Sequence, residues 1–173
     1  MRLRALEPED LDFLYSIEND MSMWWLSSQT APLSAYHLRD YVANNAGDIY
    51  KDEQVRYVIE VDNAPSGAGS TAVGLIDLFN FSPLHRRAEV GIVIKREYRN
   101  HGYAMEAIGK IADYARDILC LHQIYAIVPL SNEPSLRMLR SQGFSDGLCL
   151  KDWLFVGGSH ADAVIMQLFC EKM

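Results

Sequence analysis

Two apolar stretches joined by a short polar loop give the clearest pattern in the chain. Residues Glu89–Ile94 are rich in β-branched side chains, which predicts a strand. Beyond the loop, apolar residues recur at helical spacing from Met105 to Leu119, which predicts a helix. A second apolar run, Gln123–Val128, predicts another strand. Because a strand–helix–strand unit makes a right-handed crossover, we expect these two strands to be parallel neighbours.

The rest of the chain has the alternation and turn residues of antiparallel strands, with helical patterns between them. Further strands are predicted at Arg2–Leu6, Arg56–Val61, Thr71–Asn80, Leu148–Val156 and Ala161–Phe169. Further helices are predicted from Pro8 to Asn19, from Ser34 to Asn45 and from Asn132 to Gly143. The pattern predicts an α+β fold with about four helices in a single domain spanning residues 1–173.

Composition narrows the class of protein. The chain has 173 residues, of which 49% are hydrophobic and 23% charged, as in a globular domain. No apolar run reaches the ~18 residues that span a membrane, and the first residues do not have the pattern of a signal peptide. Three widely spaced cysteines indicate a reducing, cytoplasmic setting. The net charge of −7 argues against a nucleic-acid partner and favours a cationic ligand such as an amine.

The loop between the first strand and the helix has the spacing R-x-x-G-x-A, from Arg99 to Ala104. The N–H groups at a helix N-terminus carry partial positive charge and bind phosphate. Gly102 lets the backbone approach such an anion closely, although a glycine here can also serve only as a turn residue. The dinucleotide pattern G-x-G-x-x-G and the P-loop pattern G-x-x-x-x-G-K-[ST] are both absent from the sequence.

Three stretches together resemble one known family: residues 85–89 (HRRAE), residues 99–104 (RNHGYA) and residues 132–144. They are similar to the GCN5-related N-acetyltransferases, and closest to the spermidine- and ribosomal-protein-acetylating branches. The likeness extends over nearly the whole chain. It implies a mostly antiparallel, seven-stranded sheet with a central pair of parallel strands that splay apart. It also implies acetyl-coenzyme A (acetyl-CoA) as co-substrate and an acetyl group transferred to a primary amine by direct attack on the thioester.

The resemblance also assigns the residues that bind the cofactor, mainly through backbone atoms. The strand residues that would pair with the pantetheine amides are Ile92, Val93 and Ile94. The residues that would cradle the pyrophosphate are Arg99, Asn100, His101, Gly102, Tyr103, Ala104 and Met105. Asn132 and the helix after it would line the far side of the cofactor.

Glu89 is the predicted general base, because family members often carry a carboxylate at the start of the central strand. The alternative is an ion pair between Glu89 and Arg86 or Arg87. Asp77, on the preceding strand, is the second candidate for the base. The oxyanion of the tetrahedral intermediate would bind a strand N–H near Val93.

The group that protonates the leaving thiolate is where the sequence departs from the family pattern. Polyamine-acetylating relatives carry a tyrosine at the position of Leu139. Ser135 matches a serine of the ribosomal-protein-acetylating branch, and is either the acid or only part of a helix N-terminus. Tyr125 and Tyr103 are looser alternatives. The histidines His85 and His101 have no metal-ligand spacing, so we expect no metal.

The predicted acceptor site includes Trp24 and Trp25, which either line it or pack between two helices, together with Asp77. Several carboxylates expected of a polyamine site are missing around Ser27–Thr30. The acceptor is therefore a polyamine, a peptide N-terminus or another small amine. A non-catalytic acyl-CoA-binding domain is the alternative function. Nucleic-acid and membrane partners are not expected, and association into a homo-oligomer is left open.

Overall fold

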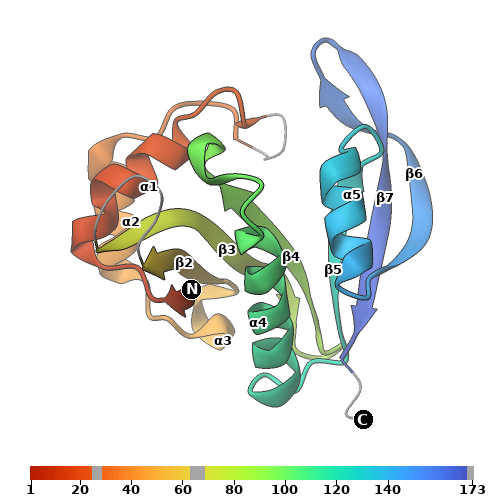
Figure 1. Cartoon of the computed structure of the whole chain (residues 1–173), viewed down its shortest axis with the longest axis horizontal. Helices are drawn as coiled ribbons and strands as arrows, with labels where there is room; N and C mark the ends of the chain where they lie inside the picture. The colour runs from red at the N-terminus through yellow and green to blue at the C-terminus, as the bar shows by residue number, and fades with distance from the viewer. Residues whose placement is uncertain (25–28, 63–68, 171–173) are drawn as a thin grey trace.

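The computed structural model describes residues 1–24, 29–62 and 69–170 (Figure 1). Seven strands form one sheet in the order β1-β2-β3-β4-β5-β7-β6. Their bounds are β1 Arg2–Arg4, β2 Val55–Asp62, β3 Ser70–Ser82, β4 Arg87–Ile94, β5 Gln123–Pro129, β6 Ser145–Val156 and β7 Ser159–Phe169. Every neighbouring pair is antiparallel except β4 and β5, which are parallel. The predicted fold class, mostly antiparallel with a parallel central pair, is confirmed.

The described residues form five α-helices and two short 3-10 turns. The helices are α1 Leu11–Glu18, α2 Ala35–Asn44, α3 Ile49–Asp52, α4 Tyr103–Asp117 and α5 Glu133–Ser141, and the turns are η1 Pro8–Asp10 and η3 Arg96–Tyr98. The sequence pattern missed α3, which is a single turn capped by the Asp48 side chain. Within the described ranges no helix is both long and apolar enough to cross a membrane.

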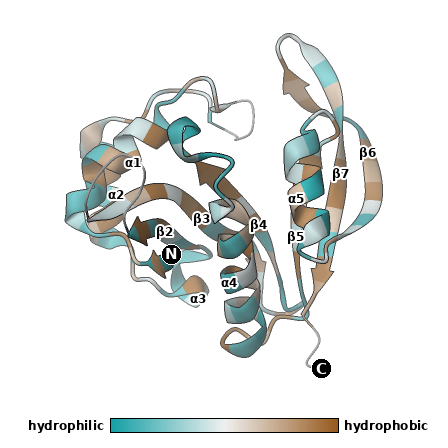
Figure 2. Ribbon diagram, in the orientation of Figure 1, coloured by the Kyte–Doolittle hydropathy of each residue, from teal (hydrophilic) through white to brown (hydrophobic). Residues whose placement is uncertain are grey.

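The helices cover both faces of the sheet. Helices α1 and α2 share one buried cluster with Val58 and Leu75, whereas α4 and α5 belong to a second cluster that contains the neighbouring strand residues Ile59 and Ile76. Successive strand residues point to opposite faces, so the two helix pairs lie on opposite sides. We call these the α1 face and the α4 face. Figure 2 shows the matching hydropathy, with hydrophobic strands between helices of mixed character.

Strand β4, which carries the predicted cofactor residues Ile92, Val93 and Ile94, approaches β3 closely. The β2–β3 register slips between Ile59 and Glu60, beside Gly74 in β3. A Cβ atom at Gly74 would lie 2.3 Å from the Val93 carbonyl oxygen. Glycine at this position therefore allows the backbone of β4 to pack against β3.

Candidate active site

The parallel pair β4–β5 opens into a gap after three residue pairs. Arg87, Ala88 and Glu89 pair with Gln123, Ile124 and Tyr125. Beyond these pairs β4 continues along β3 to Ile94, while β5 continues along β7 to Pro129. Over the described residues the edge of Val90–Ile94 that faces β5 therefore has no strand partner. Its backbone groups are available to the amides of an extended ligand, as Ile92, Val93 and Ile94 were predicted to be.

The loop after β4 leads into a helix N-terminus. Gly102 is the N-cap of α4, with φ of +81°, and nothing lies within 4 Å of the position that its Cβ would occupy. The first N–H groups of a helix have no partner within the helix, and here they belong to Gly102, Tyr103, Ala104 and Met105. These N–H groups make the start of α4 suitable for binding a phosphate group.

Arg99 and His101, which both precede Gly102, make side-chain contacts. The Arg99 guanidinium donates to the Ile94 carbonyl oxygen at 3.0 Å and contacts the Met23 sulfur at 3.0 Å. The His101 ring stacks on Tyr103, with 5.6 Å between ring centroids. Asn100 has a φ of +65° and so helps to turn the chain. Arg99 thus joins the end of β4, the loop and the segment after α1.

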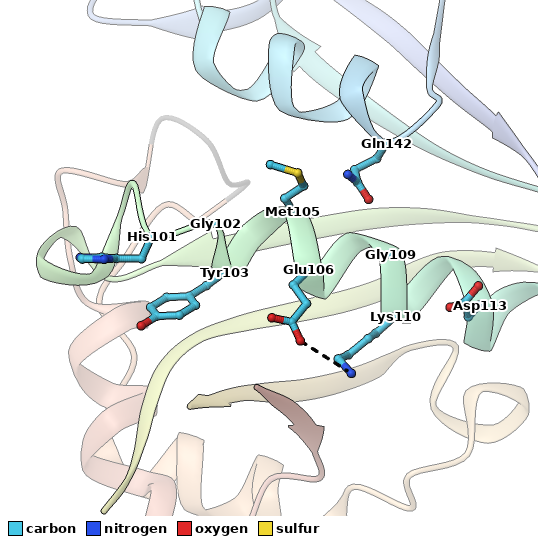
Figure 3. Close-up of a pocket in the computed structure, with 9 residues that line it drawn as sticks. All are labelled: His101, Gly102, Tyr103, Met105, Glu106, Gly109, Lys110, Asp113 and Gln142. Carbon is cyan, nitrogen blue, oxygen red and sulfur yellow. Dashed lines mark ion pairs between the residues drawn. The ribbon is translucent and has the colours of Figure 1, made fainter. Parts of the chain in front are cut away.

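Two cavities border this loop. The larger, about 610 Å³, includes His101, Gly102, Tyr103 and Met105 and extends along α4 to Gln142 (Figure 3). An ion pair of 3.8 Å between Lys110 and Glu106 lies on its wall. The smaller cavity, about 70 Å³, is lined by Val93, Ile94 and Arg99 together with residues of α1. Seven of the predicted cofactor residues therefore border one cavity or the other.

Glu89 lies at the last residue pair before the strands part, opposite Tyr125. The Asn80 side-chain amide donates to its carboxylate at 2.9 Å. Burial raises the pKa of Glu89 above the ordinary value of 4.5, and hydrogen bonds from Asn80 and Tyr125 partly oppose this rise. Arg86 donates instead to the Cys120 carbonyl at 2.7 Å. In the part of the chain that the structure describes, no salt bridge involves Glu89, which argues against the ion-pair interpretation.

Asp77 is held in a network of ion pairs. Both of its oxygens accept from Arg56, at 2.7 and 2.9 Å. Arg56 also donates to Glu18 at the end of α1, at 2.7 Å. Asp77 faces Gly91 across the β3–β4 ladder and so lies on the same face as Glu89. Arg56 occupies both carboxylate oxygens of Asp77, so the geometry favours Glu89 over Asp77 as the base.

Ser135 lies in the first turn of α5, on the other side of the sheet. The Asn132 side chain caps this helix by accepting from the Ser135 N–H at 3.4 Å, as its predicted role as N-cap requires. Glu89 is on the α1 face and α5 packs on the α4 face, so the gap between β4 and β5 separates the two residues. Glu89 on the α1 face and the Ser135 hydroxyl on the α4 face suit a reaction in which the acceptor enters from one face and contacts the cofactor in the gap.

Leu139 is part of the core. Only 3% of it is exposed, and it packs in the cluster that joins α5 to the sheet. The structure therefore assigns Leu139 to the core. At the helix end, Gly143 has a φ of +87° and the Phe144 N–H donates to the Leu139 carbonyl at 3.1 Å. Gly143 therefore ends α5 in a left-handed conformation.

Trp24 is half-buried just after α1, and its indole N–H donates to the Glu18 carbonyl at 2.9 Å. Trp24 therefore lies beside the Glu18–Arg56–Asp77 network on the α1 face. Trp25 lies outside the described residues. The contact that the sequence did not predict is that of Asn80 with Glu89, which depends on the register between β3 and β4.

Three features occur together: parallel strands that splay apart, a helix N-terminus suited to phosphate after the first of them, and a half-buried carboxylate where they part. They are typical of acyltransferases that bind an acyl thioester in a gap of the sheet. Comparison with known proteins identifies the family. The model of the acetyltransferase (GNAT) domain matches residues 1–145, so the chain belongs to the GNAT family. It is an acetyl-CoA-dependent N-acetyltransferase that acts on amines, and no observation favours the non-catalytic alternative.

One sequence relative and two solved structures of a second relative illustrate the similarity. Spermidine N(1)-acetyltransferase of Escherichia coli K12 is 31% identical over 172 residues, covering 98% of this chain and 86% of that protein. The crystal structure of spermidine N-acetyltransferase from Vibrio cholerae in complex with CoA and spermine has a TM-score of 0.82 at 28% identity, covering 97% and 94% of the two chains. A dodecameric structure of the Vibrio cholerae enzyme has a TM-score of 0.77 at 30% identity, covering 98% and 93%.

Proposed function

We propose that this protein is a single-domain enzyme that acetylates a polyamine such as spermidine, with Glu89 as the general base. The observation that carries the proposal is the position of Glu89, at the point where β4 and β5 part. A carboxylate there can take a proton from an amine that enters from the α1 face. Its pKa, raised by burial, makes it a better base than an exposed glutamate at neutral pH.

The cofactor residues act around the gap. The backbone of Ile92, Val93 and Ile94 pairs with the pantetheine arm, and the loop from Arg99 to Met105 holds the pyrophosphate. Asn132 and α5 close the far side. The amine attacks the thioester carbonyl carbon while Glu89 accepts its proton, and the N–H near Val93 stabilises the oxyanion. The C–S bond then breaks, and the thiolate takes a proton from Ser135 or water.

The α1 face supports a cationic acceptor. Glu18 and Asp77 share the one guanidinium of Arg56, so this cluster carries a net negative charge. Glu89 adds a second negative charge on the same face when it is ionised. In our proposal Trp24 and Asp77 line the acceptor site. The names of the spermidine-acetylating relatives support the same acceptor class.

Initial rates of CoA release with a panel of amines test the acceptor. The panel contains spermidine, spermine, putrescine, glucosamine and a short peptide with a free N-terminus. We expect kcat/KM for spermidine to exceed that for the peptide by about tenfold or more, the discrimination that one extra charge contact gives. A clear preference for the peptide or the amino sugar would overturn the polyamine assignment.

We further propose that the protein forms a homo-oligomer. The dodecameric structure of the Vibrio cholerae relative supports this. Light scattering after size-exclusion chromatography tests it, and a monomer at micromolar concentration would contradict it.

We place the enzyme in the cytoplasm, because its cysteines Cys120, Cys149 and Cys170 are free thiols. Recovery of the native protein from a periplasmic fraction would refute that location.

A further inference from the structure

Asn80 is positioned by an irregularity in the sheet next to Glu89. The β3–β4 register runs regularly to Phe79 opposite Glu89 and then shifts before Ser82 pairs with Arg87. Within this bulge Asn80 has a φ of +47°, a left-handed conformation that asparagine adopts more readily than most residues. Bulges next to active sites commonly redirect a side chain. Here the redirected amide lies 2.9 Å from the Glu89 carboxylate.

We infer that Asn80 is a positioning residue for the general base, holding the Glu89 carboxylate toward the gap between β4 and β5. The inference rests on the proposed function of Glu89. Asn80 donates from β3 on one side of β4, and the Tyr125 hydroxyl interacts with the same carboxylate from β5 on the other side. The Ile127 backbone N–H also interacts with this carboxylate. Together with it, the two side-chain donors restrict rotation of the carboxylate from opposite sides.

The choice of an amide fits this role because its charge does not change with pH. The titratable groups around Glu89 are Tyr125 from β5, Arg87 in β4, whose charge acts on Tyr125, and Asp77 in β3, which is paired with Arg56. Gln123 on β5 and Gln167 on β7 are neutral, and the Gln167 side-chain amide donates a hydrogen bond to the Gln123 side-chain oxygen. Asn80 therefore lowers the pKa of Glu89 without changing its own charge as the pH changes. A donor to the charged form lowers a pKa, so its loss must raise the pKa of Glu89.

The test is the pH dependence of kcat in two variants. Asn80→Gly removes the amide and tolerates the left-handed backbone without strain. We expect the acid limb of its pH–rate profile to move up by about one pH unit, the size of one charge-assisted hydrogen bond. Asn80→Asp keeps the backbone preference but puts a carboxylate beside Glu89, and should move the limb further in the same direction. In both variants the affinity for acetyl-CoA should stay at the wild-type value.

Glu53→Gly is the matched control, because Glu53 has a φ of +54° at the end of α3. Its profile should coincide with the wild-type profile. If both Asn80 variants keep the wild-type acid limb, whatever their kcat, Asn80 is only structural and the inference fails. Failure of the proposed function is a different result: a wild-type protein that binds acetyl-CoA but acetylates no amine at any pH.

Discussion

Glu89→Gln is expected to slow acetyl transfer about a hundredfold or more at neutral pH, the usual contribution of a general base. Glutamine keeps the size of the side chain and can still contact Asn80 and Tyr125, but it cannot take a proton. The wild-type rate should fall as the pH drops through the raised pKa of Glu89, because the protonated acid is inactive as a base. The variant should lack this acid limb.

Steady-state kinetics from pH 5 to 9, with saturating acetyl-CoA and the best amine of the panel, provide the measurement. Titration calorimetry should give the same acetyl-CoA affinity for the variant and the wild type. Glu9→Gln, at an exposed glutamate in η1, is the control for loss of a surface charge. A variant with near-normal kcat at pH 7 would remove Glu89 from the mechanism and return Asp77 as the candidate.

Gly102→Val is expected to weaken acetyl-CoA binding roughly thirtyfold or more, because a few charge-assisted contacts to the pyrophosphate are lost. The Cβ position of Gly102 is in open space, so the valine Cβ does not collide with surrounding residues. It would instead occupy the space in front of the first N–H groups of α4. A β-branched residue also disfavours the φ of +81° at this position and so disturbs the helix start.

Gly47→Val is the matched control, because Gly47 has a φ of +66° and equally open surroundings away from the loop. Comparing the two variants separates backbone strain from loss of the anion site. Calorimetric titration with acetyl-CoA measures the affinity, and thermal melting verifies that both variants are folded. An unchanged affinity in folded Gly102→Val would refute the pyrophosphate assignment.

The local features of the site could be predicted from the sequence. The parallel pair follows from two apolar runs and the helix between them, and the start of α4 follows from the position of Gly102 in its loop. The caps of α5 follow from Asn132 and Gly143 in the same way. These features depend on backbone preferences within a few residues, and such preferences can be read from residue types.

The contacts that decide side-chain roles could not be predicted. Arg56 and Asp77 are 21 residues apart, and only the β2–β3 register brings them together. The contact of Asn80 with Glu89 depends on a bulge of one strand against the next. The position of Leu139 in the core depends on the rotation of α5 on the sheet. Register and helix rotation are set by packing of the whole core, which no short stretch specifies.

The central claim is that an amine in the gap attacks the thioester directly, with no acetyl group passing through the protein. A single-turnover experiment tests it: the enzyme loaded with acetyl-CoA is mixed with excess spermidine, quenched in acid, and analysed by mass spectrometry. We predict acetylated amine and free CoA in equal amounts from the first time point, and a protein mass that never increases. An acetylated protein that forms without amine and disappears when spermidine is added would contradict the account.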